Sequence, residues 1–144
     1  MKRVLVFGAF DVIHPGHRSF LKQAREHGDY LIVSVARDSF IITNKGRRPI
    51  HTEDVRRQYV LATGLVDEAY LGDEVPGTYA QLREIKPDVV CVGYDQEEFK
   101  RDIAQWLATH DPHVELVTLD PFEPDRYKSS KLNAEAYRAM KKTT

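Results

Sequence analysis

The feature that most constrains how this chain can fold is its first segment, residues 2–17, with the sequence KRVLVFGAFDVIHPGH. The apolar run from Val4 to Phe7 predicts a buried strand, and Gly8 directly after it allows the backbone to turn tightly. Pro15 suits the first position of a helix, where its missing N–H costs nothing. A strand, a glycine turn and a helix start in this order predict a site for anionic phosphate. The helix would present unpaired N–H groups and the positive end of its dipole.

Two histidines stand at the start of this helix. His14 and His17 are three residues apart, so they share one face of the first turn, and Gly16 between them keeps a side chain out of the way. Imidazole N–H groups placed there can donate hydrogen bonds to phosphate oxygens as charge shifts during a reaction. Zinc binding is an alternative, although no third Cys or His is placed nearby to complete a site. The pair could also be ordinary exposed residues at a helix start.

The run GAFDVIHPGH, residues 8–17, resembles the G-x-F-D-x-x-H-x-G-H signature of the cytidylyltransferase-like nucleotidyltransferases. Enzymes of this superfamily transfer a nucleoside monophosphate from a nucleoside triphosphate to a phosphorylated acceptor and release pyrophosphate. The resemblance implies that His14 and His17 are catalytic, stabilising the transferring and leaving phosphates. It also implies a set of nucleotide-binding residues: Gly8, Ala9, Phe10, Asp11, His14, Gly16 and His17. Mg²⁺ or another divalent cation would bridge phosphate oxygens, with Asp11 as a candidate indirect partner and no residue assigned as a direct ligand.

Strands and helices are expected to alternate along the rest of the chain. Further strands are predicted over residues 29–36, 66–71, 88–93 and 114–119, and helices over residues 15–27, from near 52 to 64, over 77–86, through 99–107 and through 132–140. Arg37 begins a long connection, in which residues 44–49 are predicted as loop. The alternation predicts an α/β fold, a Rossmann-like doubly wound five-stranded parallel sheet with helices on both faces, as a single domain over residues 1–144. Ligands on such a sheet bind beyond the carboxyl ends of the strands.

The composition excludes several classes of protein. Of the 144 residues, 42% are hydrophobic and 30% are charged, which is typical of a soluble globular domain. The net charge of −1 argues against a dedicated nucleic-acid binder, and no apolar run is long enough to span a membrane. The chain enters a strand at once with no signal peptide, and its single cysteine, Cys91, lies in an apolar run. We therefore expect a cytoplasmic protein without an internal disulfide.

A cation-rich loop and a helix start carry the next candidate residues. Lys45 lies in the run KGRR, where the family has a lysine that reaches the triphosphate, although a solvated basic loop has the same composition. The run from Glu53 to Arg56 resembles the family's acidic-x-x-Arg helix start, whose arginine faces the phosphates. The resemblance implies that Lys45 and Arg56 are catalytic, and Arg57 stays open as the alternative to Arg56.

Two later segments resemble other nucleotide-binding parts of the family. Asp95, in the run GYDQ, stands where relatives hold the ribose, although it could instead cap the next helix. Residues 127–130, YKSS, resemble a motif whose hydroxyl groups bind nucleotide phosphates at a second helix N-terminus. The resemblance implies nucleotide binding by Asp95, Tyr127, Ser129 and Ser130, and a plain N-cap would explain Ser130 equally well.

Similarity along nearly the whole chain looks greatest to the archaeal FAD synthases, carried by runs such as residues 35–38, 45–50 and 93–96. That resemblance implies transfer of AMP from ATP to FMN, with Arg37 and Tyr94 binding the acceptor. Candidate stacking partners for the flavin ring are Tyr94, Phe122 and Tyr127.

Two alternative functions stay open at this point. Within the superfamily, the chain could be a glycerol-3-phosphate cytidylyltransferase using CTP, or another sugar- or polyol-phosphate nucleotidyltransferase. From a different class, it could be a non-catalytic nucleotide-binding module. The expected partners are a nucleoside triphosphate and a small phosphorylated acceptor, with no nucleic acid and no membrane, and the superfamily implies a homodimer.

Overall fold

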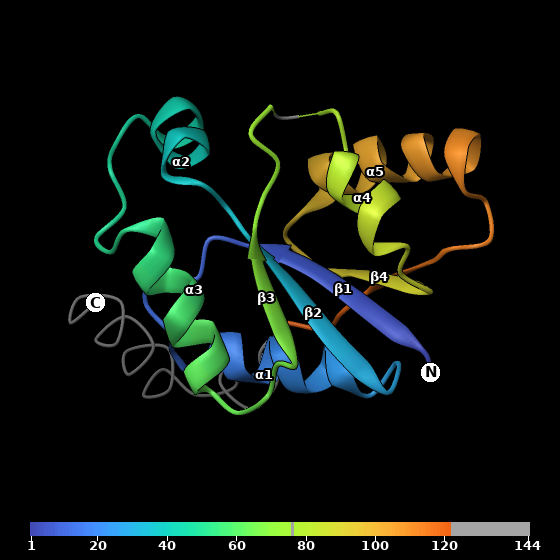
Figure 1. Ribbon diagram of the computed structural model, residues 1–144, viewed down its shortest axis with the longest axis horizontal. Helices are drawn as coiled ribbons and strands as arrows, with labels where there is room; N and C mark the ends of the chain where they lie inside the picture. Colours follow the sequence, from blue (N-terminus) through green and yellow to red (C-terminus); the bar gives the residue numbers. More distant parts are fainter. Residues whose placement is uncertain (76, 122–144) are drawn as a thin grey trace, which may run out of the picture.

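Five parallel strands form one sheet in the computed structural model, which describes residues 1–75 and 77–121 (Figure 1). The strands are β1 (Arg3–Gly8), β2 (Tyr30–Val35), β3 (Glu68–Leu71), β4 (Val89–Val92) and β5 (Glu115–Thr118). They lie in the order β3-β2-β1-β4-β5, and every neighbouring pair is parallel, so the predicted fold class is confirmed. The order reverses between β1 and β4, and open α/β sheets bind their ligands at such a switch point.

Helices cover both faces of this sheet. Helices α1 (Pro15–Arg25) and α3 (Glu53–Ala62) pack on one face, and α4 (Ala80–Ile85) and α5 (Glu97–His110) pack on the other. Helix α2 (Asp38–Lys45) lies apart from both layers, beyond the carboxyl end of β2 (Figure 1). Within residues 1–75 and 77–121, no helix combines the length and the apolar character needed to cross a membrane.

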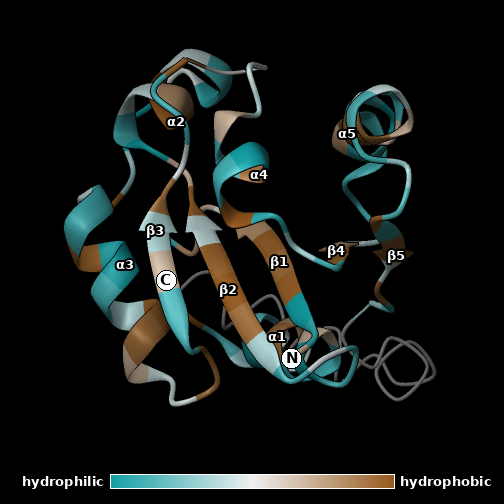
Figure 2. Ribbon diagram, turned by 45° about the vertical axis from the view of Figure 1, so that its right-hand side comes forward, coloured by the Kyte–Doolittle hydropathy of each residue, from teal (hydrophilic) through white to brown (hydrophobic). Residues whose placement is uncertain are grey.

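The core lies on both sides of the central strands. Side chains alternate along β1, so that Val4 and Val6 pack toward α1 and α3 while Leu5 packs toward α4 and α5. All three are completely buried. Figure 2 shows β1 and β2 as apolar strands at the centre, whereas the edge strand β3 is mostly pale or polar in colour. A strand that is covered on both faces has apolar residues along most of its length, so β1 and β2 are easily recognised as strands in the sequence.

Three aspartates join the strands at the amino-terminal edge of the sheet. Each one precedes a strand, and its carboxylate accepts a hydrogen bond from a backbone N–H at the start of the neighbouring strand. The pairs are Asp29 with Lys2 (2.9 Å), Asp67 with Leu31 (2.9 Å) and Asp88 with Arg3 (2.8 Å). These bonds hold the strand ends in register at the edge opposite the expected ligand site.

The structure differs from the sequence-based expectation in the connections. Residues 38–45 form α2, where the sequence predicts a connection that is loop from residue 44, and the helix ends at Gly46 with a φ of 69°. Only Ile41 of this helix is buried, so no apolar stripe marks it in the sequence. The helix predicted over 77–86 is shorter and begins at Ala80. The helix predicted through 132–140 lies outside the described residues.

Candidate active site

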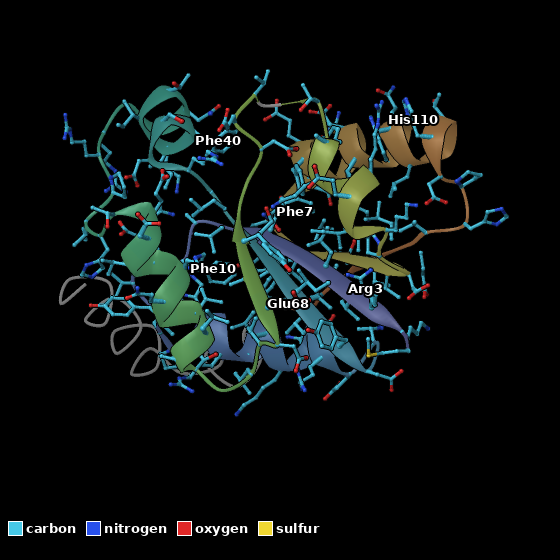
Figure 3. The ribbon with its side chains drawn as sticks, viewed as in Figure 1. Arg3, Phe7, Phe10, Phe40, Glu68 and His110 are labelled. Atoms are coloured by element: carbon cyan, nitrogen blue, oxygen red, sulfur yellow. The ribbon has the colours of Figure 1, made fainter. Side chains whose placement is uncertain are left out.

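The loop after β1, residues 9–14, takes a strained turn at Phe10, and we call it the histidine loop. Phe10 has a φ of 50°, which is rare for a bulky residue. Its ring is only 3% exposed and crosses Gly8, where an added Cβ would lie 2.6 Å from the ring. Figure 3 shows Phe7 at the carboxyl end of β1 and Phe10 on the side of the sheet that α3 covers. Position 8 therefore requires glycine because the Phe10 ring takes the space of any side chain.

His14 and His17 lie together at the start of α1. Their rings stack with centroids 4.0 Å apart and planes inclined by 28°. The Gly16 N–H donates to Nδ1 of His14 (3.0 Å), and the His14 N–H donates to Nδ1 of His17 (3.3 Å), so His14 is the N-cap of the helix. Because Nδ1 accepts in both rings, each neutral imidazole carries its proton on Nε2. The Nε2–H is then the donor group of each ring, and the His17 ring also bonds to the backbone of Val12.

The first amide groups of α1 change one expectation about anion binding. Pro15 has no N–H, and Gly16 gives its N–H to the His14 ring rather than to the open edge. The site expected from unpaired helix amides is therefore partly filled by an imidazole nitrogen. Anion binding at this helix start would depend mainly on the two imidazoles and on the positive end of the helix dipole.

Burial keeps His17 neutral. Loss of solvation and, to a smaller extent, the neighbouring His14 lower the pKa of His17, while a hydrogen bond to the backbone of Val12 opposes both effects, and together they bring the pKa from 6.5 to about 4. Contact with the Phe10 ring, at a centroid distance of 5.3 Å, forms part of this burial. His17 is therefore an uncharged hydrogen-bond donor throughout the neutral pH range.

The carboxylate of Asp11 binds backbone on both of its oxygens. Oδ2 accepts the Ile50 N–H (2.7 Å) and Oδ1 accepts the His51 N–H (2.8 Å), which joins the histidine loop to the segment before α3. Among the described residues, no group of three or more His, Cys, Asp and Glu side chains could hold a metal ion. These residues do not fit a protein-bound Mg²⁺.

Arg56, whose guanidinium the family resemblance predicts to face the phosphates, is completely buried in this structure. Nη1 donates to the carbonyl of Ala9 (2.8 Å), Nε donates to the carbonyl of His51 (3.0 Å), and Nη2 donates to the carboxylate of Asp38 (2.7 Å). All three nitrogens therefore bind protein atoms in this structure. A buried arginine is tolerated only when it is paired in this way.

The cations at the end of α2 are exposed, in contrast to Arg56. Lys45 is the last residue of the helix, and Gly46 turns the chain so that the basic residues 47–48 follow on the surface. Arg57, the alternative to Arg56, is directed elsewhere, because its Nη1 donates to the carbonyl of Ala69 in β3 (3.0 Å). Of the predicted triphosphate-binding cations, Lys45 is thus the one that the structure leaves open to solvent.

Arg37 precedes α2 and is held firmly at one nitrogen only. Nε donates to the carbonyl of Gly72 (2.7 Å), while the two Nη atoms lie 3.8 Å from Glu53 and 4.0 Å from Glu74. The Glu74 side chain is 83% exposed, and such long surface ion pairs contribute little. The outer nitrogens of Arg37 could therefore change partners without disturbing the fold.

The carboxyl end of β4 presents Tyr94 and Asp95 to solvent. Gln96 is the residue before α5, and its Oε1 accepts the Gly93 N–H (2.7 Å). The alternative that Asp95 caps this helix is therefore wrong, and its carboxylate stays exposed. Four predicted residues lie outside the described part of the chain, namely Phe122, Tyr127, Ser129 and Ser130.

A cleft of about 310 Å³ opens beside the histidine loop, between the start of α1 and α3. Its walls are formed by Val12, Ile13, Arg18, His51, Tyr59, Ala62 and Thr63. The volume is at the small end of the range for small-molecule sites, and Arg18 provides a cation. The histidine loop therefore borders open space on the side of α3 as well as at the sheet edge.

A family model described as cytidylyltransferase-like matches residues 5–134 of this chain. The chain belongs to the cytidylyltransferase-like family. A crystal structure in the same fold, a lipopolysaccharide core biosynthesis protein from Thermoplasma volcanium GSS1, is 34% identical and superposes with a TM-score of 0.77. The match covers 85% of this chain and 99% of that one.

Several sequence relatives of this cytidylyltransferase-like chain are named FAD synthase. The relative from Ferroglobus placidus is 47% identical over 105 residues, which are 71% of this chain and 67% of the relative. The relative from Thermococcus kodakarensis is 39% identical over 133 residues, which are 90% of this chain and 88% of the relative.

Sequence reasoning missed how Asp38 and Glu53 serve the site of this cytidylyltransferase-like protein. Asp38 accepts from Arg56 in its side chain, and its backbone N–H donates to Oε1 of Glu53 (2.8 Å). These partners lie 18 and 15 residues away along the chain, so no local spacing connects them. The only signal in the sequence was Asp38, the acid directly after Arg37. An acid in the first turn of a helix is already explained by its favourable interaction with the helix dipole.

Proposed function

We propose that this chain is an FMN adenylyltransferase, which transfers AMP from ATP to FMN and forms FAD and pyrophosphate. The observation that carries the proposal is the stacked pair His14 and His17 at the start of α1, in a chain whose relatives at 39–47% identity are named FAD synthase. A phosphate oxygen of FMN bonds to the α-phosphorus of ATP, the bond from that phosphorus to the bridging oxygen breaks, and pyrophosphate leaves with the electron pair. No covalent enzyme intermediate is needed, so catalysis rests on positioning and charge stabilisation.

The two histidines act where negative charge grows in this step. Each donates from Nε2 to oxygens of the α- and β-phosphates as the bond between them breaks. His17 suits this role because its low pKa keeps the donor in one protonation state across the neutral range. Lys45, on the exposed end of α2, neutralises the leaving pyrophosphate as a point charge.

We assign the remaining roles to groups that lie near the carboxyl edge of the sheet. The backbone of residues 8–11 and Gly16 line the path of the triphosphate, and Asp95 accepts from the ribose hydroxyls. The loosely held nitrogens of Arg37 bind the FMN phosphate, and the exposed ring of Tyr94 stacks with the isoalloxazine. Nucleotide binding by Tyr127, Ser129 and Ser130 stays a prediction from the sequence.

Three statements about context also stay predictions: a cytoplasmic location, expected from the sequence composition, and a homodimer and a need for Mg²⁺, both implied by the family resemblance. The described residues do not form a ligand set for Mg²⁺. The cation would therefore arrive with ATP, bound by phosphate oxygens and water, as Mg²⁺ commonly is in nucleotide enzymes.

The test of the proposal is to supply the protein with FMN and ATP and to detect FAD by chromatography and fluorescence. Glycerol 3-phosphate with CTP is run in parallel, and pyrophosphate is measured in both. Formation of FAD is the expected result. Product only with glycerol 3-phosphate and CTP would overturn the flavin assignment, and the absence of pyrophosphate with every acceptor would indicate a non-catalytic nucleotide-binding module.

Replacing Lys45 by alanine should raise the KM for ATP by about tenfold and lower turnover as well, because a charge-assisted contact to phosphate is lost. Steady-state kinetics with varied ATP measures both effects. Lys22→Ala is the matched control, since Lys22 is an exposed lysine near the far end of α1. Equal kinetics in the two variants would show that Lys45 does not contact the nucleotide.

A further inference from the structure

Arg56 binds three segments that together frame the proposed site. Its acceptors are the carbonyl of Ala9 in the histidine loop, the carboxylate of Asp38 at the start of α2, and the carbonyl of His51 before α3. The side chain is 0% exposed, so the guanidinium cannot touch a substrate in this structure. Its effect on the reaction has to pass through the groups that it holds.

The bonds of Arg56 close around the strained residue of the histidine loop. On one side of Phe10, the Ala9 carbonyl accepts from Arg56, and on the other side the Asp11 carboxylate accepts from the His51 N–H. The His51 carbonyl accepts from Arg56 in turn, which completes the ring of contacts. A phenylalanine in the left-handed region of backbone conformation costs free energy and persists only where its surroundings hold it. The ring of contacts around Arg56 provides that restraint.

The same guanidinium also fixes the helix that carries Lys45. Asp38 stands in the first turn of α2 and Lys45 at its end, so the bond from Asp38 to Arg56 ties the whole helix to α3. The bond from the Asp38 N–H to Glu53 adds a second tie between the same two helices. The histidine loop and helix α2, which carries Lys45, are thus joined through the Arg56 side chain.

We infer that Arg56 is a positioning residue, which sets the placement of the two histidines relative to Lys45 and binds no phosphate itself. This inference rests on the proposed function, because the groups that it aligns are those assigned to phosphate transfer. A lysine at position 56 would keep the charge but could not reach three acceptors in three directions. Misplacement of catalytic groups by a fraction of an ångström lowers turnover strongly, while substrate binding outside the loop is retained.

The test compares Arg56→Lys, Asp38→Asn and the double variant by steady-state kinetics with FMN and ATP. We expect each single variant to lower kcat by about tenfold or more with the KM for ATP within about threefold of wild type, and the double variant to be no slower than the worse single one. Arg25→Lys is the matched control. Arg25 binds the carbonyl of Leu65 (2.9 Å) and the carboxylate of Asp67 (2.8 Å) at the opposite edge of the sheet.

Three kinetic outcomes would overturn the inference: a normal kcat in Arg56→Lys, a KM for ATP raised tenfold at unchanged kcat, or fully additive losses in the double variant. A purely structural role would lower the melting temperature and leave kcat per folded molecule unchanged, which also overturns it. Asp38→Asn removes only one of the three contacts, so it provides the kinetic test if Arg56→Lys does not fold.

A measurement without substrate separates this inference from the proposed function. The Ile50 and His51 amides donate to Asp11, and their hydrogen exchange should accelerate at least tenfold in Arg56→Lys while the amides of β1 and β2 stay protected. Unchanged hydrogen exchange at the Ile50 and His51 amides would show that Arg56 does not hold the histidine loop. If the wild-type protein makes no FAD, the proposed function fails, whereas this exchange experiment still decides whether Arg56 holds the loop.

Discussion

Replacing His14 by asparagine is expected to lower turnover by about 10²-fold or more while the protein stays folded, the scale of losing one preorganised donor. Asparagine places an acceptor oxygen near the position of Nδ1, so it can still take the Gly16 N–H and remains a preferred N-cap. It has no group at the position of Nε2, so the proposed phosphate donor is lost. The same change at His17 keeps an acceptor for the His14 N–H and removes the second donor.

The measurement is kcat with FMN and ATP, with circular dichroism as the check on folding. His113→Asn is the matched control, because His113 is exposed in the turn before β5 and takes no part in the site. That variant should keep wild-type turnover. Turnover within about threefold of wild type in both the His14 and His17 variants would exclude the imidazoles from the chemistry.

Acid should destabilise the protein through His17 by roughly 3 kcal/mol between pH 7 and pH 4. The pKa of His17 is about 4 in the folded protein and 6.5 in its ordinary state, so the unfolded chain binds the extra proton between these values. The stability contributed by neutral His17 is therefore complete above pH 6.5 and is lost as the pH falls toward 4. Urea unfolding at a series of pH values in this window measures the loss.

The His17→Asn variant isolates this contribution, because asparagine does not titrate. Acids such as Asp67, whose pKa is lowered by its bond to Arg25, add their own loss at lower pH in both proteins. The difference between wild type and variant should therefore shrink steadily from pH 6.5 to pH 4. Two parallel curves across that window would mean that His17 is not held neutral by burial. His113→Asn should follow the wild-type curve.

The sequence predicted the sheet well because the strands are marked by burial. The runs that form β1, β2 and β4 are covered on both faces and are therefore mainly apolar, with Ser34 as the one polar residue inside β2. Helix α2 was not predicted because its packing is different. It buries only Ile41 and leaves Phe40 exposed, as Figure 3 shows at the outer edge of the fold, so no helical period appears in its sequence. Tertiary contacts such as the Asp38–Arg56 pair position it instead.

The site was predictable where its residues are neighbours in sequence and unpredictable where they are not. His14 and His17 meet because three residues of helix separate them, so their shared face follows from spacing alone. Arg56 meets Ala9 across 47 residues, and nothing local distinguishes a buried arginine from one that faces a phosphate. The family pattern identified Arg56 as a functional residue, and only the fold showed which atoms its guanidinium binds.

The three aspartates at the amino-terminal edge of the sheet affect which parts of this protein can be altered without loss of the fold. Asp29, Asp67 and Asp88 set the strand register from the end of the sheet that carries no proposed substrate contact. A slip by one residue would break these bonds and move every side chain of the strand to the opposite face of the sheet. The loops at the opposite edge are therefore not needed to align the strands. They can accept insertions or new residues while the sheet stays intact. Grafting a different acceptor loop after β4 should leave the melting temperature nearly unchanged, which makes this fold a practical starting point for altering substrate range.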